Sequence, residues 1–286
     1  LSRHYPQKWN YQPVENLGEL NIGSRTLTFL ETRMLHWPDS MFTYAKEDQI
    51  LFSSDAFGQH LASNERFDDQ VRHELMVQSR KYFANILLLY SPLILKLIDK
   101  VTEMKLPLKM LCPDHGVIWR KDPGKIIETY GTWSRQEPKR KALVIYDTMW
   151  HSTEKMAFSI VEALGENQVE ARALHLRSNH RSDILTEVLD AGAILIGSPT
   201  LNNGLFPTVS DFLTYMKGLK PKNKIAAAFG SYGWSGEAVK LINAEFEEMK
   251  FQVIDPGVKS QYVPDEDGIK ACRELAGKVA LALPSE

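Results

Sequence analysis

Three loops in the second half of the chain have side chains suited to an anionic, planar ligand. The first, residues 147–153, follows the apolar, β-branched run 142–146 and leads into a helix that we expect to begin near Thr153. The first amides of a helix lack partners and its dipole favours negative charge, so hydroxyls gathered there predict an anion site. The loop lacks the glycines of both common nucleotide motifs, G-x-G-x-x-G and G-x-x-x-x-G-K-[ST]. A hydroxyl-rich loop suits a single phosphate, such as that of flavin mononucleotide (FMN).

The other two loops fit the rest of such a ligand. Residues 198–204 are rich in small and amide side chains that can hydrogen-bond a ring edge, and the glycines and aromatics of 230–236 allow close approach and stacking. Polar loops are also ordinary at strand ends, but three together favour a bound planar cofactor with a phosphate. We interpret His151 as a loop-packing or flavin-edge residue rather than a catalytic base. The predicted flavin-binding residues are Thr148, Met149, Trp150, His151, Ser152, Thr153, Ser198, Pro199, Thr200, Leu201, Asn202, Asn203, Gly204, Ser231, Tyr232, Gly233, Trp234, Ser235 and Gly236.

A regular alternation of strands and helices positions these loops. Hydrophobic periodicity predicts strands at 142–146, 169–175, 193–197, 224–229 and 251–254, and helices at 153–165, 182–190, 207–218, 236–250 and 266–282. Five strands interleaved with five helices predict a parallel, doubly wound α/β domain. In such sheets ligands bind past the carboxyl ends of the strands, where all three loops lie.

The first half of the chain has a different pattern. Short strands are expected at 25–32, in a hairpin of 41–44 and 49–53, and at 110–113, with a helical rhythm over 69–104 and a last helix at about 124–135. The charged segment 136–141, broken by Pro138, marks a boundary between domains at 1–137 and 138–286.

Composition narrows the functional class. With 43% apolar and 24% charged residues the chain reads as globular, and a net charge of −2 argues against nucleic acid as a partner. Two distant cysteines indicate neither a disulfide framework nor a zinc knuckle, which fits the cytoplasm. The longest apolar run, near 86–90, is too short to span a membrane. No signal peptide is visible, but the chain starts at Leu1 within an ordinary polar segment, so we expect its true N-terminus to be missing.

Six motifs in one order resemble those of the flavodiiron proteins (A-type flavoproteins of the rubredoxin:oxygen oxidoreductase and nitric oxide reductase type). The resemblance covers essentially the whole chain. The motifs are Leu-His-Trp-Pro-Asp-Ser-Met at 35–41, Asp-Ala-Phe-Gly at 55–58, Cys-Pro-Asp-His-Gly at 112–116, Thr-Met-Trp-His-Ser-Thr at 148–153, Gly-Ser-Pro-Thr-Leu-Asn-Asn-Gly at 197–204 and Gly-Ser-Tyr-Gly-Trp-Ser-Gly at 230–236. It implies an α/β chain: a partial metallo-β-lactamase-like αββα sandwich, then a flavodoxin-like, doubly wound five-stranded parallel sheet.

The resemblance also implies two non-haem irons in the first domain. Carried over by motif, His36 would be a terminal ligand on one iron and His115 a terminal ligand on the other, and the Asp55 carboxylate would bridge the two irons. Nitrogen and oxygen ligands suit iron, and a bridging carboxylate holds two cations near one substrate. The family's further ligands lie in an H-x-E-x-D-type segment that does not occur here. The iron site is therefore incomplete in this sequence, and we expect the chain to be the C-terminal part of a longer protein. In the truncated form we expect flavin binding to survive and the diiron site to be lost or poorly occupied.

The implied function is that of an oxidoreductase in electron transport. FMN would take electrons from rubredoxin or a reduced deazaflavin, and the irons would reduce dioxygen to water, nitric oxide to nitrous oxide, or both. Trp37, beside His36, would line the gas pocket or pack at the sandwich rim. The family forms head-to-tail homodimers, or dimers of dimers, with no membrane or nucleic-acid partner.

Two alternatives stay open. The chain could be a flavodoxin-like electron carrier whose first domain is catalytically inactive, which the missing ligand segment favours. It could also be a metallo-β-lactamase-type hydrolase with an accessory domain, against which the three flavin loops argue. An absorption spectrum combined with metal analysis would separate the three.

Overall fold

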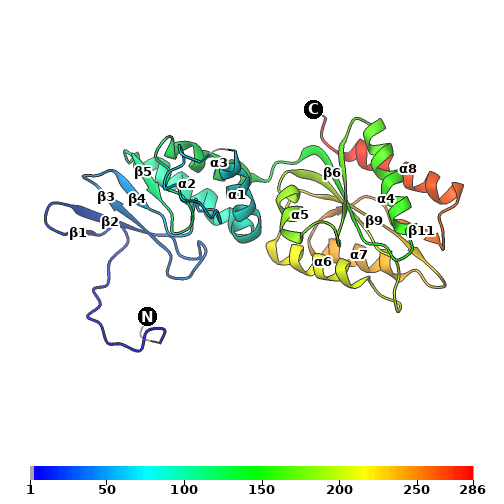
Figure 1. Cartoon of the computed structure of the whole chain (residues 1–286), viewed down its shortest axis with the longest axis horizontal. Coiled ribbons are helices and arrows are strands. Elements are labelled where there is room, and N and C mark those ends of the chain that lie inside the picture. Colours follow the sequence, from blue (N-terminus) through cyan, green and yellow to red (C-terminus); the bar gives the residue numbers. More distant parts are fainter. Residues whose placement is uncertain (1–2, 72, 286) are drawn as a thin grey trace. The chain divides into compact units, whose positions relative to one another are not determined.

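A computed structural model of the chain describes residues 3–71 and 73–285. Leu1, where we expect a segment to be missing, lies outside these residues. The chain divides into two compact units (Figure 1): unit 1 comprises Leu1–Met76 and Lys96–Glu128, and unit 2 comprises Val77–Leu95 and Thr129–Glu286. The units divide the chain at other positions than residue 137, so the expected domain boundary stays a prediction.

Unit 1 is built on a five-stranded mixed sheet of order β1-β2-β3-β4-β5. Its strands are β1 (Glu19–Asn21), β2 (Thr26–Glu31), β3 (Met41–Ala45), β4 (Ile50–Phe52) and β5 (Met110–Cys112). β1 to β4 pair antiparallel in sequence order, and β5 joins β4 in parallel. The expected strand at 25–32 and the expected hairpin are confirmed. The buried side chains Leu30, Phe42 and Leu51 come from three successive strands, because alternation along each strand turns every second residue inward.

A broken helical stretch covers much of the region with the predicted helical rhythm. It consists of α1 (Glu74–Tyr82), a π-helical turn η1 (Phe83–Leu87), a 3₁₀ turn η2 (Leu88–Tyr90) and α2 (Ser91–Met104), and α3 (Pro123–Arg135) follows β5. Within the described residues, Glu74–Met104 is long and apolar enough to cross a membrane by length and composition. The buried core helices of proteins outside membranes can have the same length and apolar composition, and 44% of the apolar window of this stretch is buried. This stretch therefore does not decide whether the protein has a membrane partner, and that expectation stays untested.

The middle of this stretch belongs to unit 2. Phe83 packs edge-on against Tyr130 with ring centroids 5.0 Å apart. The Asn85 side chain donates to the Ser182 carbonyl at 3.0 Å and accepts from the Tyr215 hydroxyl at 2.8 Å. These contacts explain why Val77–Leu95 groups with the C-terminal sheet rather than with its own sequence neighbours.

Unit 2 is a doubly wound parallel sheet of order β10-β9-β8-β6-β7. Its strands are β6 (Lys139–Tyr146), β7 (Glu170–His175), β8 (Ala191–Gly197), β9 (Ile225–Tyr232), β10 (Gln252–Val253) and β11 (Val258–Gln261). Its helices are α4 (Ser152–Glu166), α5 (Arg181–Val188), α6 (Pro207–Leu219), α7 (Glu237–Glu248) and α8 (Glu266–Ala282). The five predicted strands and five predicted helices are all present. This order, 2-1-3-4-5 by position, is the flavodoxin-like arrangement.

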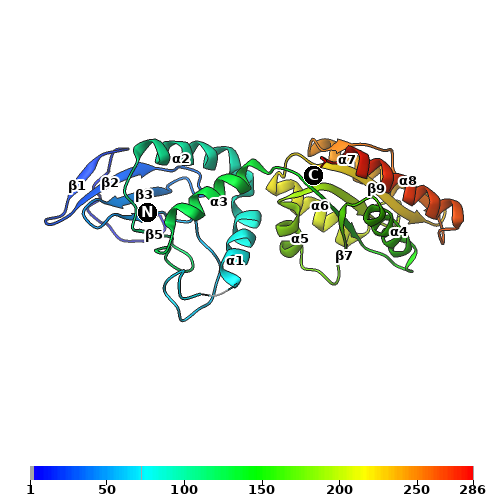
Figure 2. The ribbon, with the colours of Figure 1, turned by 90° about the horizontal axis from the view of Figure 1, so that it is seen from above.

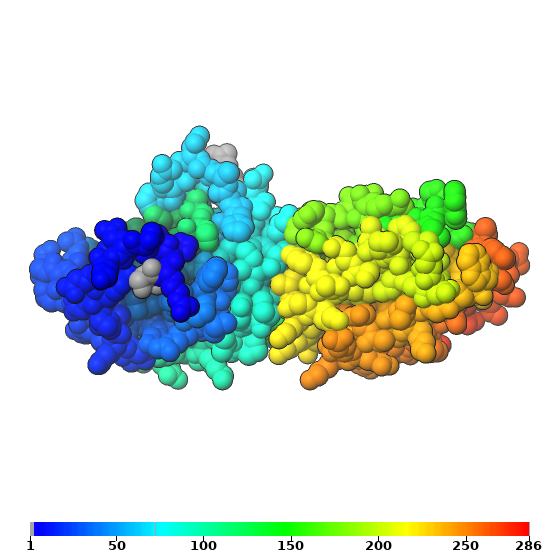
Figure 3. All heavy atoms as spheres, turned by 90° about the horizontal axis from the view of Figure 1, so that it is seen from below, coloured from blue at the N-terminus to red at the C-terminus, as the bar shows by residue number. Residues whose placement is uncertain are grey.

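Helices cover both faces of this sheet (Figure 2). α4 and α8 share a core with one face, built on buried residues such as Val144, Leu195 and Phe229. α5, α6 and α7 cover the other face, and Figure 3 shows the yellow atoms of α6 beside the orange atoms of α7. The central strands β8 and β9 are buried on both faces, which explains their continuous apolar sequences.

The outer edge strand beside β9 is interrupted. β10 pairs with Ile225–Ala226, and β11 pairs farther along with Phe229–Tyr232. Gly257, between them, has φ +98°, and a Cβ there would lie 2.7 Å from the Ala228 carbonyl oxygen. The single strand predicted at 251–254 is therefore only the first half of this edge.

Candidate functional site

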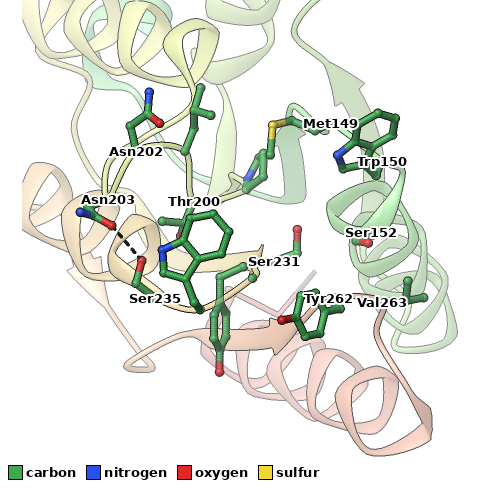
Figure 4. Close-up of a pocket in the computed structure, with 15 residues that line it drawn as sticks. Met149, Trp150, Ser152, Thr200, Asn202, Asn203, Ser231, Ser235, Tyr262 and Val263 are labelled. Carbon is green, nitrogen blue, oxygen red and sulfur yellow. Dashed lines mark hydrogen bonds between the residues drawn. The ribbon is translucent and has the colours of Figure 1, made fainter.

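A pocket of about 370 Å³ lies at the carboxyl ends of the central strands of unit 2 (Figure 4). All three predicted loops contribute to it, because β6, β8 and β9 are parallel neighbours and their carboxyl ends meet at one edge. Its lining residues are Met149, Trp150, Ser152, Pro199, Thr200, Leu201, Asn202, Asn203, Ser231, Tyr232, Gly233, Trp234, Ser235, Tyr262 and Val263.

Six of the predicted flavin-binding residues do not line this pocket: Thr148, His151, Thr153, Ser198, Gly204 and Gly236. Thr148, Thr153 and Ser198 are buried beneath the loops. Gly204 closes the second loop by exchanging two backbone hydrogen bonds with Leu201, at 2.9 and 3.1 Å. His151 lines a neighbouring groove with Trp150 and Ser152. Their roles as flavin contacts therefore stay predictions.

Sequence analysis missed Tyr262 and Val263, which reach the pocket from the end of β11. The available signal was an aromatic residue, Tyr262, directly after the short segment 258–261 that forms β11. We did not expect that strand segment, because the Pro256-Gly257 pair reads as the end of the edge strand.

One end of the pocket suits a phosphate. α4 begins at Ser152, and its first backbone amides lack intrahelical partners. The buried hydroxyls of Thr153 and Ser231 lie 2.9 Å apart and join the first loop to the third. Thr148 Oγ1 is buried without a hydrogen-bond partner among the described residues. An orphaned hydroxyl beside a helix N-terminus fits an absent anionic ligand.

The other end suits a flat ring system. The side chains of Trp150 and Trp234 are 83% and 86% exposed, and that of Tyr262 is 65% exposed. Exposed apolar side chains that gather around one pocket, as these three do, are typical of a ligand-binding or partner-binding site. Ser235 donates its hydroxyl to the Asn203 side chain at 3.1 Å, which fastens the second loop to the third (Figure 4). The donor set and the shape of the pocket thus fit FMN.

Asp147 anchors the first loop from below. Its carboxylate is fully buried and accepts hydrogen bonds from the Thr148 N–H at 2.6 Å, from Arg177 Nε at 2.9 Å and from the Thr208 hydroxyl at 2.6 Å. His175 Nε2 lies 3.1 Å from the same oxygen as Arg177. Burial works to raise the pKa of Asp147, but the hydrogen bonds and the Arg177 charge together outweigh it and lower that pKa. Asp147 is therefore held as a carboxylate.

A second chain of contacts starts at His151. Its Nδ1 lies 2.7 Å from Glu154 Oε2, and the other Glu154 oxygen accepts from the Tyr146 hydroxyl at 3.1 Å. Burial, followed by the hydrogen bond to Glu154, raises the pKa of Tyr146 to about 12. The His151 hydrogen bond lowers the pKa of Glu154. His151 is thus paired with a carboxylate at the loop surface, and its role as a loop-packing or flavin-edge residue stays a prediction.

In unit 1 the structure brings together the three residues predicted as iron ligands. His36 Nε2 lies 3.6 Å from Asp55 Oδ2, and His115 Nε2 lies 3.2 Å from Asp55 Oδ1. Each carboxylate oxygen therefore faces a different imidazole, which is the arrangement a bridging carboxylate between two cations would need. Trp37, 60% exposed, packs beside His36 with ring centroids 5.7 Å apart.

Backbone and amide contacts hold the two loops of this cluster together. The buried Gln59 side chain accepts from the Val117 N–H at 2.8 Å and donates to the Val117 carbonyl at 3.2 Å. Gly116 has φ +82°, and a Cβ there would lie 1.7 Å from Gln59 Oε1, so only glycine fits. The loop carrying Asp55 is thus fixed against the loop carrying His115.

The donor set accounts for only part of a diiron site. Two imidazoles and one carboxylate are too few to complete two iron coordination spheres. Across residues 3–71 and 73–285, no group of three or more His, Cys, Asp or Glu residues is arranged to hold a metal ion. His60 packs edge-on against His115 with ring centroids 5.4 Å apart. His36 and His115 each face one oxygen of Asp55, so these residues supply at most part of a ligand set.

Known proteins match both halves of the chain. The flavodoxin family profile matches residues 144–275, and the profile of the ODP family of beta lactamases matches residues 1–116. A nitric oxide reductase of Moorella thermoacetica is 46% identical over 283 residues, which are 98% of this chain and 71% of that protein.

Solved structures agree. The rubredoxin oxygen:oxidoreductase from Desulfovibrio gigas matches with a TM-score of 0.95 and 40% identity, over 98% of this chain and 71% of that one. The flavodiiron protein from Giardia intestinalis matches with a TM-score of 0.88 and 36% identity, over 94% and 68%. The expected order of a beta-lactamase-like domain followed by a flavodoxin-like domain is confirmed. The chain belongs to the flavodiiron protein family.

Proposed function

We propose that this chain is a flavodiiron oxidoreductase that binds FMN in the pocket of unit 2 and iron at His36, Asp55 and His115. Bound FMN would accept electrons in pairs and release them singly, and iron would bind a diatomic gas. The names of the relatives in Desulfovibrio gigas and Moorella thermoacetica support dioxygen and nitric oxide as substrates. We propose that the chain reduces dioxygen to water, nitric oxide to nitrous oxide, or both.

The observation that carries the proposal is the pocket where three loops meet. The amides at the start of α4 and the orphaned Thr148 hydroxyl would hold the phosphate. Trp150 and Trp234 would lie against the ring, and the Asn202 and Asn203 amides would meet its polar edge. We also propose that Asp55 orients the two imidazoles, because each of its oxygens faces one of them.

The resemblance to flavodiiron proteins also supports proposals for the electron donor, the assembly and the location of this protein. We propose rubredoxin or a reduced deazaflavin as the electron donor, a head-to-tail homodimer or dimer of dimers as the assembly, and the cytoplasm as the location. Residues 1–137 would form the iron-binding domain and 138–286 the flavin-binding domain.

One experiment tests the central proposal. Purified protein incubated with FMN and ferrous iron without oxygen, then desalted, is analysed by absorption spectroscopy and metal analysis. The proposal requires a flavin spectrum with retained iron, followed by consumption of dioxygen or nitric oxide when reduced rubredoxin is added. A colourless zinc protein with esterase activity would contradict it.

A second function is favoured by the partial ligand set. With only His36, Asp55 and His115 together, the chain could be a flavodoxin-like electron carrier with an inactive first domain. That alternative requires stoichiometric FMN, no retained iron and no gas consumption in the same experiment.

A further inference from the structure

The phosphate end of the pocket has an unusual charge environment. Within the part of the chain that the structure describes, the pocket lining includes no lysine or arginine. A fully buried carboxylate, Asp147, is the first residue of this loop and accepts a hydrogen bond from the N–H of the next residue, Thr148. A buried anion so close to a bound phosphate would oppose binding, because charge interactions inside a protein are screened less than in water.

Arg177 compensates this anion. Its Nε donates to Asp147 Oδ1 at 2.9 Å, and its Nη2 donates to the carbonyl of Thr148 at 2.6 Å. One guanidinium therefore touches both the buried anion and the backbone of the phosphate loop. The guanidinium stays charged at any working pH and its planar fork suits two acceptors at once.

The other polar side chains near this loop have partners of their own. Glu154 is paired with His151, and Lys155 donates to the Pro264 carbonyl at 2.9 Å. His175 shares the Asp147 oxygen with Arg177. Thr208, at the start of α6, takes the second carboxylate oxygen. Among the described residues, Arg177 is the permanent cation that hydrogen-bonds both Asp147 and the backbone of the loop that would hold the phosphate.

We propose that Arg177, paired with Asp147, is a positioning residue that makes this site selective for phosphorylated flavin over riboflavin. Arg177 cancels the Asp147 charge and fixes the Thr148 carbonyl, so the loop presents its amides and hydroxyls to the phosphate without a net negative charge beneath it. This inference rests on the proposed binding of FMN.

The test compares FMN with riboflavin, which carries the same ring but no phosphate. Both are titrated into the full chain at pH 8, where histidine is ordinarily neutral, by quenching of flavin fluorescence. Arg177→Gln is expected to weaken FMN binding about tenfold and riboflavin binding by less than about twofold, because Arg177 is half exposed and water screens its charge. Arg177→Lys should restore most of the loss, and higher salt should reduce the difference.

Two further variants distinguish an electrostatic effect of Arg177 on phosphate binding from a purely structural effect on the loop. Asp147→Asn keeps an oxygen for the Arg177 and Thr148 donors, and the Thr208 hydroxyl can turn to accept from the new amide. The positive charge of Arg177 then has no buried carboxylate to oppose it. The ratio of FMN affinity to riboflavin affinity should therefore rise about tenfold. Arg172→Gln is the matched control: Arg172 is half exposed on β7, pairs with Glu187, and should leave both affinities unchanged.

The outcomes are distinct. Equal losses for FMN and riboflavin in Arg177→Gln, or no loss for either, would overturn the proposal, because Arg177 would then only brace the loop or do nothing. A lower preference for FMN in Asp147→Asn would overturn the charge argument. Failure of the unaltered chain to bind either flavin would instead refute the proposed function, and the two failures are therefore distinguishable.

Discussion

The hydroxyls of Thr153 and Ser231 lie 2.9 Å apart and are both buried, although 78 residues separate them in the chain. Thr153 belongs to the first turn of α4, and Ser231 lies near the end of β9. This contact ties the anion-binding loop to the aromatic loop at the floor of the pocket. The two loops are therefore one structure rather than two independent surface segments.

The contact leads to a prediction for flavin affinity and stability. Ser231→Ala should lower the free energy of unfolding by about 1–2 kcal/mol, because it leaves the Thr153 hydroxyl buried without a partner. FMN affinity should fall as well, since Ser231 lines the pocket. Urea unfolding and FMN titration measure the two effects.

The control for this prediction is a serine on α4, the helix that carries Thr153. Ser159 on α4 is also buried, and its hydroxyl has no partner among the described residues, so Ser159→Ala should cost little. In the Thr153→Val/Ser231→Ala double variant the losses should be smaller than the sum of the single losses. Additive losses would show that the two hydroxyls do not interact.

Trp234 gives a prediction of a different kind. Its side chain is 86% exposed, so Trp234→Ala should change the free energy of unfolding by less than about 0.5 kcal/mol. Loss of an aromatic contact with the ring should weaken FMN and riboflavin roughly three- to tenfold and to the same extent. Isothermal titration with both flavins measures this.

The comparison variant is Trp37→Ala in unit 1, which also removes a largely exposed tryptophan, 60% exposed. It should leave both flavin affinities unchanged. A loss for FMN alone in Trp234→Ala would place this side chain at the phosphate rather than at the ring.

The sequence predicted unit 2 well because its signals are local. A continuous apolar strand such as 193–197 is recognised from its composition and length, and an amphipathic helix such as 266–282 from its periodicity. The parallel order of the strands then places the three loops at one edge of the sheet. The prediction failed where structure depends on distant packing. β11 was missed because Pro256 and Gly257 read as the end of a strand, whereas the glycine allows close approach to the Ala228 carbonyl.

The candidate sites show the same limit. The flavin loops were identified from composition, but the contacts of Asp147 with Arg177, His175 and Thr208 join residues 28 to 61 positions away, which spacing does not reveal. The cluster of His36, Asp55 and His115 rested on family resemblance alone. Separations of 19 and 60 residues carry no periodic signal. The pairing of β4 with β5, which those separations do not reveal, brings Asp55 and His115 to one end of the sheet.

Lys224 predicts a pH dependence of stability. It is 3% exposed and donates to the carbonyl of Ala191 at 2.8 Å, and burial lowers its pKa from 10.5 to about 7. The unfolded chain therefore binds one more proton than the folded chain between about pH 7 and 10.5, so stability rises with pH across this window and is lost as pH falls towards 7.

Lys224→Met removes this proton equilibrium. The stability of the unaltered protein minus that of the variant should rise with pH, at up to about 1.4 kcal/mol per pH unit within that window. Urea unfolding at several pH values from 6 to about 10 provides the difference. Lys240→Met, at an exposed position on α7, should give a difference that does not depend on pH. The same flat difference for Lys224→Met would show that Lys224 keeps an ordinary pKa.

Iron binding by unit 1 is the final prediction. His36, Asp55 and His115 offer three donors, so after anaerobic loading with ferrous iron and desalting the chain should retain fewer than the two irons of a complete site, together with about one FMN. Asp55→Asn should lower the iron content further, because the neutral amide cannot balance two cations, while the FMN content stays the same. Asp114→Asn alters an exposed carboxylate beside His115 and should leave both contents unchanged. Two retained irons per chain, or iron content that is insensitive to Asp55→Asn, would contradict this assignment, and elemental analysis together with the flavin absorbance distinguishes the cases.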